Sequence, residues 1–323
     1  MERPTLQDVF RARNIIRRYL PPTPLLPSAP LSQMFGCEIY IKYENHQPIG
    51  AFKVRGGLNL LHSLSPEERS RGVITASTGN HGQSIAYAAR VFQTRAVIAM
   101  PVESNPDKVE AMRHLGAEIL FHGKDFDESR LFAEQLAREQ GYRYVHPANE
   151  PLLVAGVGTI GLEIIEAVPD IDVIISPIGG GSGVSGNAIV AKTINPRIQI
   201  IGVQSEKAPA VYRSWKAGKM IEMDTVETFA EGLATRVPFA LTFGIIRDLV
   251  DEIVLVSEDE LRRAILLLLE KTHNLAEGAG AASTAGAWKI RDRLQGKKVA
   301  LVLSGGNLPL AVLQEIINQH HPL

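Results

Sequence analysis

The chain has 323 residues, 45% of them hydrophobic, and its 34 Lys and Arg side chains almost balance its 35 Asp and Glu. A chain of this length can bury a sizeable core, and its net charge of −1 gives no electrostatic reason to expect nucleic acid as a partner. No stretch is apolar for long enough to span a bilayer or act as a secretion signal, so we expect a cytoplasmic protein without a membrane partner. The only cysteine, Cys37, excludes an internal disulfide and a zinc cluster of several thiolates.

Runs rich in β-branched and apolar residues recur along the chain and predict strands. These runs are residues 38–42, 72–76, 96–100, 118–121, 172–178, 198–204, 253–256 and 298–303. Segments with helical period lie between or after them, at residues 83–92, 107–115, 128–140, 259–273 and 308–318. The alternation predicts an α/β fold, with a mostly parallel sheet and helices on both faces.

Glycine-bearing loops follow three of the expected strands, at residues 77–82, 179–183 and 304–307. In open α/β sheets, ligands bind beyond the carboxyl ends of the strands, where helix N-termini and bare backbone N–H groups attract anions. Glycine also serves ordinary turns, so one such loop is a weak signal. Three of them, each at a strand end, indicate an anion site.

The middle loop allows a different interpretation, because residues 181–186 read G-S-G-V-S-G and match the dinucleotide pattern G-x-G-x-x-G. That pattern expects an acidic residue at the end of the next strand, about 20 residues further on. Here the strand ends in Gln204, although Glu206 is close to it. A dinucleotide-dependent oxidoreductase is therefore an alternative from another enzyme class, and a catalytically silent small-ligand sensor is a further one.

Lys53 follows a turn that contains Pro48 and Gly50, at a point where we expect a helix to begin. The positive end of a helix dipole disfavours the charged form of an amine. A neutral amine is what a lysine needs to form a Schiff base. Without its surroundings, Lys53 would be better explained as a surface lysine on a helix.

The segment around this lysine, G-A-F-K-V-R-G at residues 50–56, resembles the S-F-K-x-R-G segment of threonine/serine dehydratases and serine racemases. The three glycine loops follow that family's order, and P-T-P-L at residues 22–25 resembles its early T-P-L motif. The resemblance covers nearly the whole chain and implies the tryptophan-synthase-β-like fold, pyridoxal phosphate (PLP) fold type II, with two open, twisted, mostly parallel sheets. It also implies a large PLP-binding domain (residues 1–71 and 150–323), a small domain (residues 72–149) and no C-terminal regulatory domain.

By this resemblance, Lys53 carries PLP as a Schiff base and Phe52 packs beside the ring. Asn80 would bind the 3-oxygen of the ring, Ser304 would meet its nitrogen, and Glu277 would support the site. The other implied contacts lie in the glycine loops: the phosphate on Gly179, Gly180, Gly181, Ser182 and Gly183, and the substrate carboxylate on Ser77, Thr78, Gly79, Asn80 and His81.

Some positions depart from the family pattern. Serine racemases have a serine at the position of Thr78, where it reprotonates the opposite face of the substrate. Thr78 keeps the hydroxyl and is a candidate catalytic residue, but its extra methyl group alters its rotamers, so we expect elimination to be favoured over racemisation. The family's divalent metal site draws on a Glu at a strand end and an Asp soon after, but residues 203–210 read V-Q-S-E-K-A-P-A. We therefore expect no metal at that place. His81 is a possible base by residue type, and we expect it to be structural.

The resemblance implies a PLP-dependent ammonia-lyase that removes the β-hydroxyl of L-threonine, L-serine or a related small amino acid and releases a 2-oxo acid and ammonia. An amino-acid racemase, or a dehydratase of 3-hydroxyaspartate or of a hydroxyectoine-derived substrate, stays open as an alternative. Family analogy also implies a homodimer or a higher homo-oligomer.

Overall fold

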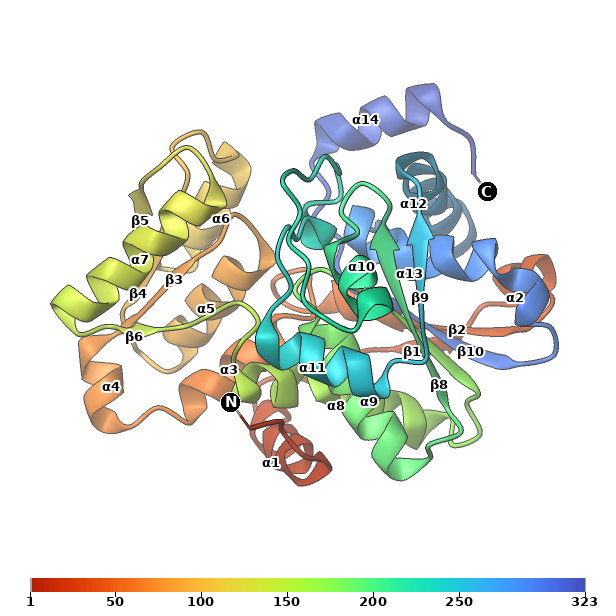
Figure 1. The fold of residues 1–323 in the computed structure, drawn as a ribbon, viewed down its shortest axis with the longest axis horizontal. Helices are drawn as coiled ribbons and strands as arrows, with labels where there is room; N and C mark the ends of the chain where they lie inside the picture. Colours follow the sequence, from red (N-terminus) through yellow and green to blue (C-terminus); the bar gives the residue numbers. More distant parts are fainter. Residues whose placement is uncertain (1, 323) are drawn as a thin grey trace.

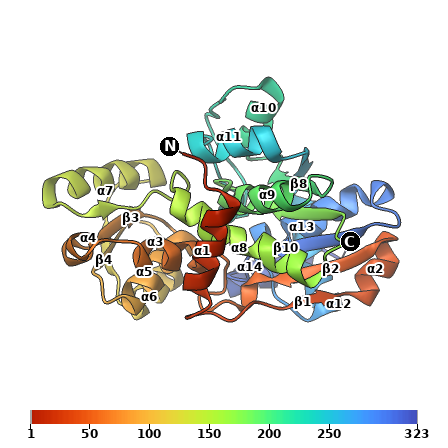
Figure 2. The same cartoon turned by 90° about the horizontal axis from the view of Figure 1, so that it is seen from below.

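Two sheets organise the computed structural model, which describes residues 2–322. One sheet has six strands in the order β1-β2-β10-β7-β8-β9, and the other has four in the order β5-β4-β3-β6. Figure 1 shows the two sheets on opposite sides of the molecule, each among its helices, and Figure 2 shows the same arrangement from below. Every strand pair is parallel except β1 with β2. The predicted fold class is confirmed.

Both faces of the six-stranded sheet are buried. Its strands are β1 (Leu25–Pro27), β2 (Glu38–Tyr43), β7 (Val173–Pro177), β8 (Gln199–Ser205), β9 (Glu252–Val256) and β10 (Lys298–Leu303). Successive side chains of a strand point to opposite faces, so Val173 and Ile175 pack with one set of helices and Ile174 with the other. The first set is α2 (Ala29–Phe35), α12 (Glu258–Thr272) and α13 (Gly278–Lys289), and the second is α1 (Leu6–Ile16), α8 (Pro151–Ala167), α9 (Ser182–Ile194) and α11 (Ala240–Leu249).

The four-stranded sheet is covered in the same way. Val73 and Ile98 pack towards α5 and α6, whereas Ile74 and Val97 pack towards α7. Its strands are β3 (Val73–Ala76), β4 (Ala96–Met100), β5 (Glu118–Phe121) and β6 (Arg143–Tyr144), and its helices are α5 (Asn80–Val91), α6 (Pro106–His114) and α7 (Phe126–Gln140). The remaining elements are α3 (Val54–His62), α4 (Pro66–Arg71), α10 (Ala210–Ala217), α14 (Leu310–Gln319) and three short 3₁₀ helices, η1 (Glu44–His46), η2 (Glu231–Leu233) and η3 (Arg291–Arg293).

The strands predicted at residues 96–100, 118–121 and 298–303 have the predicted bounds, and the other five differ by one residue at one or both ends. Strands β1 and β6 were not predicted, because they span only three and two residues and carry no periodic signal of their own. α5 begins three residues earlier than predicted, within the first glycine loop. Within the described residues, no helix is long and apolar enough to cross a membrane.

Three buried charged side chains, Lys42, Glu44 and Arg55, lie together beside α3 and meet a fourth, Glu163, whose side chain is 14% exposed. The Arg55 guanidinium donates to both oxygens of Glu44, at 2.8 Å each, and to both oxygens of Glu163, at 2.6 and 2.8 Å. Lys42 Nζ donates to Glu163 as well. Although burial opposes it, the positive charge of Arg55 lowers the pKa of Glu44. The network holds two charges of each sign and ties the first turn of α3 to β2, η1 and α8.

Candidate active site

Lys53 is the residue immediately before α3, as the sequence predicted. Its Nζ atom donates a hydrogen bond to Ser182 Oγ, at 2.9 Å, and lies 5.2 Å from the centroid of the Phe52 ring. No described carboxylate pairs with this amine. Burial lowers the pKa of Lys53 to about 8. Loss of contact with water therefore makes this amine easier to deprotonate, whereas the sequence had suggested the helix dipole as the cause.

The turn that carries Lys53 packs against the third glycine loop. The Phe52 backbone N–H donates to the Ser304 carbonyl oxygen at 3.0 Å, and Ala51 forms an isolated antiparallel bridge with Gly305. Ser304 itself is buried and directly follows β10. The structure thus brings together residues that lie about 250 positions apart in the sequence.

The middle glycine loop lies at the N-terminus of α9 and leaves no room for a side chain at Gly179 or Gly181. A Cβ on Gly179 would lie 2.0 Å from the Gly232 carbonyl oxygen, and Gly181 has a φ of +87°, which favours glycine. Helix N-termini with bare backbone N–H groups bind phosphate. Residues 179–183 therefore fit the phosphate of a cofactor, and Lys53 reaches them.

Gly186, the last glycine of the G-x-G-x-x-G pattern, has a packing role. A Cβ there would lie 2.6 Å from the backbone nitrogen of Gly158, so this glycine lets α9 approach α8. Gln204, at the position where a dinucleotide site needs an acid, accepts a hydrogen bond from the Tyr212 backbone at 2.9 Å. These contacts do not support the dinucleotide alternative.

Amide and carboxyl groups from three loops meet beside the lysine turn. Asn80 Nδ2 donates to Glu277 Oε1 at 2.7 Å, and Asn307 Nδ2 donates to Asn80 Oδ1 at 2.7 Å and to the Ile49 carbonyl at 2.8 Å. Burial raises the pKa of Glu277 to about 7, against the opposing hydrogen bond from Asn80. Asn307 was not singled out from the sequence, although it ends the third glycine loop and the loop was recognised.

The first glycine loop is shaped by Ser77. Its Oγ accepts hydrogen bonds from the backbone N–H groups of Gly82, at 2.9 Å, and Gly79, at 3.2 Å. Thr78 is half-buried, and the space beside Gly79 is open, since a Cβ there would meet no atom within 4 Å. Because Ser77 fixes the backbone of this loop and the space beside Gly79 is open, the loop can receive a small anionic group such as a carboxylate.

His81 faces inward from the same loop. It is buried, and its Nε2 lies 3.0 Å from Thr75 Oγ1. The Thr75 hydroxyl donates to the Val145 carbonyl at 2.7 Å, so the oxygen of Thr75 accepts from the Nε2–H of His81. Burial, helped by the charge of Lys53, lowers the pKa of His81 to about 3. His81 is therefore neutral at pH 7.

We expect the free energy of unfolding of the wild-type protein to fall more steeply than that of a His81→Asn variant as the pH is lowered from 6.5 towards 3. In this window the unfolded chain, with the ordinary histidine pKa near 6.5, binds one proton that folded His81 does not. The additional slope is at most about 1.4 kcal/mol per pH unit. Urea unfolding at a series of pH values measures it, and equal slopes would contradict a neutral, buried His81.

Two ion pairs join helices α6 and α7, which cover the four-stranded sheet, to the segment between α10 and α11. Lys108 of α6 pairs with Glu231 of η2, and Asp127 of α7 pairs with Arg236. Lys108 and Glu231 both influence the pKa of Glu277, which places this pair near the site. Neither pair could be predicted from the sequence, because each joins residues more than 100 positions apart.

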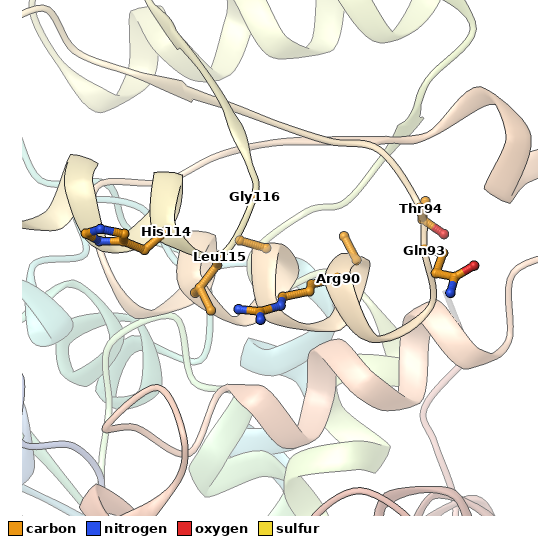
Figure 3. Close-up of a pocket in the computed structure, with 8 residues that line it drawn as sticks. Arg90, Gln93, Thr94, His114, Leu115 and Gly116 are labelled. Carbon is orange, nitrogen blue, oxygen red and sulfur yellow. The ribbon is translucent and has the colours of Figure 1, made fainter.

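A surface hollow of about 250 Å³ lies elsewhere, at the C-terminal end of α5, the end opposite to Asn80. Figure 3 shows Arg90, Gln93, Thr94 and His114 around it. It contains none of the predicted site residues. A smaller cavity lies at the predicted site, lined by Phe52, Ile160, Ser176, Pro177, Gly183, Asn187, Val302 and Ser304.

Comparison with known proteins shows the family. The model of the family described as pyridoxal-phosphate dependent enzyme matches residues 16–305. The L-threonine ammonia-lyase of Thermotoga maritima is 42% identical over 315 residues, which cover 98% of this chain and 78% of that protein.

Solved structures give the same result. The processed form of threonine deaminase isoform 2 from Solanum lycopersicum superimposes with a TM-score of 0.93 at 32% identity and covers 98% of this chain and 90% of that one. Maize serine racemase gives a TM-score of 0.93 at 32% identity and covers 98% of both chains. The region matched by the family model includes Lys53 and the middle glycine loop. The chain therefore belongs to the family of pyridoxal-phosphate-dependent enzymes, and it is a lyase related to the threonine ammonia-lyases.

Proposed function

We propose that the protein removes the β-hydroxyl group of L-threonine or L-serine and releases the corresponding 2-oxo acid and ammonia. The observation that carries this proposal is the position of the Lys53 amine, which has no carboxylate partner among residues 2–322 and lies 2.9 Å from Ser182 Oγ, in the loop that fits a phosphate. A lysine in this position can both hold PLP and act as a base. The names of the relatives support threonine as the first substrate to test.

The residues around Lys53 suit PLP. In this proposal the backbone N–H groups of residues 179–183 hold the phosphate, and Phe52 packs beside the ring. Asn80, supported by Glu277, binds the ring oxygen, and Ser304 meets the ring nitrogen. When bound, PLP withdraws electrons from the α-carbon of an amino acid.

The remaining steps use groups of the chain. Backbone and side-chain donors of residues 77–81 receive the substrate carboxylate, which fixes the α-carbon relative to Lys53. Lys53 Nζ takes the proton from the α-carbon. Loss of the β-hydroxyl as water leaves an enamine, and its imine form hydrolyses to the 2-oxo acid and ammonia. Water is released once and consumed once, so the reaction balances.

A visible spectrum of the purified protein, before and after addition of L-threonine or L-serine, tests the proposal when 2-oxo acid and ammonia are assayed in the same samples. An absorption band of bound PLP together with release of oxo acid supports it and ranks the two substrates. A PLP band without release of oxo acid or ammonia from either amino acid would contradict the proposed reaction.

Racemisation is the second candidate, because maize serine racemase and the threonine deaminase of Solanum lycopersicum superimpose on this chain with the same TM-score, 0.93. Thr78 keeps a hydroxyl on the loop that receives the substrate. We expect Ser304→Asp to raise the ratio of racemisation to elimination, since a carboxylate would favour protonation of the ring nitrogen. Chiral chromatography of the amino acid and an oxo-acid assay measure the ratio, and an unchanged ratio would argue against the place proposed for Ser304.

The organisation of the protein is also part of the proposal. We infer a small domain of residues 72–149, which contains the whole four-stranded sheet, and a large domain of residues 1–71 and 150–323. A homodimer or higher homo-oligomer and a cytoplasmic location are proposed by analogy with the family. Light scattering coupled to gel filtration measures the oligomeric state.

A further inference from the structure

We propose that the hydroxyl group of Ser182 is a positioning group for Lys53, which holds the ε-amine whenever that amine is not bonded to the cofactor. The inference rests on the proposed function, in which Lys53 Nζ must act as a base after substrate has displaced it. It assigns to the Ser182 side chain a task separate from that of the Ser182 backbone N–H in the phosphate loop.

The geometry favours this assignment. Ser182 is buried, at 2% exposure, and is the first residue of α9, so its backbone is fixed by the helix. Gly181 precedes it in the left-handed conformation and turns the loop into the helix. The Ser182 hydroxyl accepts from Lys53 Nζ at 2.9 Å, while the backbone N–H groups of the loop are separate donors that can serve an anion. Oγ also has a hydrogen that it can donate to the lone pair of a neutral amine.

The groups around the Lys53 amine help it to lose its proton, and a neutral hydrogen-bond partner such as a hydroxyl preserves this. Two helices, α3 and α9, begin here and present their positive ends. The charge of Lys53 also acts on His81 and His146, and burial lowers their pKa values to about 3 and about 4, so both are neutral at pH 7. A carboxylate in the place of Ser182 would hold Lys53 as an ammonium ion and remove the base. A hydroxyl orients the amine without fixing its charge.

The held amine explains how a flexible side chain can act as a base. A lysine has four rotatable side-chain bonds, and ordering them in each turnover opposes reaction. A base that is misplaced by about 1 Å can lower a rate about 100-fold. In the proton transfer the α-carbon C–H bond breaks, its electron pair stays with the substrate, and the Nζ lone pair forms the new N–H bond. The ammonium group then donates to Ser182 Oγ.

Ser182→Ala tests the proposal, because it removes the hydroxyl and keeps the backbone N–H. We expect kcat to fall about 10- to 100-fold with KM and PLP affinity unchanged, and Ser182→Thr to restore most of kcat. Ser185→Ala is the matched control: Ser185 lies on the same helix, is buried, and its hydroxyl contacts the Thr242 carbonyl at 3.4 Å and not the lysine. The control should keep the wild-type kcat.

A second measurement does not need turnover. In protein freed of PLP, an amine-specific reagent modifies Lys53 at a rate that depends on pH, and mass spectrometry of the Lys53 peptide follows it. An ammonium group is a stronger donor than a neutral amine, so loss of the acceptor should move the inflection to lower pH and speed labelling at neutral pH. Ser185→Ala should label like the wild type.

Either of two results would overturn the inference. The first is a Ser182→Ala protein with unchanged kcat and labelling profile. The second is weaker PLP binding with an unchanged labelling profile, which would make the hydroxyl a phosphate ligand only. If the wild type releases no oxo acid from any amino acid tested, the proposed function fails. The labelling comparison would still decide whether the Ser182 hydroxyl holds the Lys53 amine.

Discussion

Glu163→Gln is expected to lower the free energy of unfolding by about 3–5 kcal/mol, because it leaves the buried charges of Lys42, Glu44 and Arg55 with a net positive charge. The carboxylate of Glu163 accepts from Lys42 and from two nitrogens of Arg55, and an amide cannot replace it for both cations. Urea unfolding followed by circular dichroism measures the loss.

Glu166→Gln is the matched control for this change. Glu166 lies on the same helix, α8, and pairs with Arg13 at 2.6 Å, but its side chain is 52% exposed. An exposed ion pair contributes about 0–1 kcal/mol, so the control should lose no more than that. Similar losses of stability in the two variants would contradict the claim that burial makes the Glu163 network stronger than an exposed ion pair. Since Arg55 is two residues from Lys53, we also expect Glu163→Gln to bind PLP less tightly.

Lys53→Ala is expected to remove the visible absorption of bound PLP and to lower the ammonia-lyase activity by at least about 1,000-fold, because the variant loses both the attachment point and the base. Lys124→Ala, a change at a lysine side chain with 79% exposure outside the site, should keep both. Absorption spectra and an oxo-acid assay of the two purified variants measure the effect.

Lys53→Ala should also fold at least as stably as the wild-type protein when both are free of PLP. The wild-type side chain is half-buried, and its amine has no carboxylate partner in the described part of the chain; the pKa of about 8 shows that its charged form is disfavoured there. An alanine variant that is active and still shows the PLP band would place the Schiff base on another lysine. A strongly destabilised variant would mean that Lys53 has a packing role in addition.

Much of the fold could be predicted from local sequence patterns. The strand at residues 96–100 is a continuous apolar run between polar segments, and the helix that begins near residue 258 follows Ser257, whose side chain caps it together with Glu260. Such signals need only neighbouring residues. The short strands β1 and β6 could not be found in this way, because they are strands only through pairing with β2 and β3.

The candidate site divides in the same way. The segment around Lys53 and the three glycine loops can be recognised as motifs, since each motif is a run of a few residues. The hydrogen bond from Asn307 to Asn80 and the approach of Lys53 to Ser182 join loops that are 227 and 129 residues apart, and no motif contains both partners. The buried network around Arg55 was also unseen, because polar residues in strands and helices give no sign of being buried together.

The sequence by itself determined the α/β class, the positions of the main strands and helices, the family and the lysine most suited to hold PLP. These follow from period, composition and short motifs, which depend on neighbouring residues. The tertiary structure alone decided which groups surround that lysine: Ser182 as its partner, no paired carboxylate among the residues that the structure describes, and burial that lowers its pKa to about 8. The reason is physical, since the protonation and orientation of an amine depend on water, charge and donors in space, and folding brings these from distant parts of the chain.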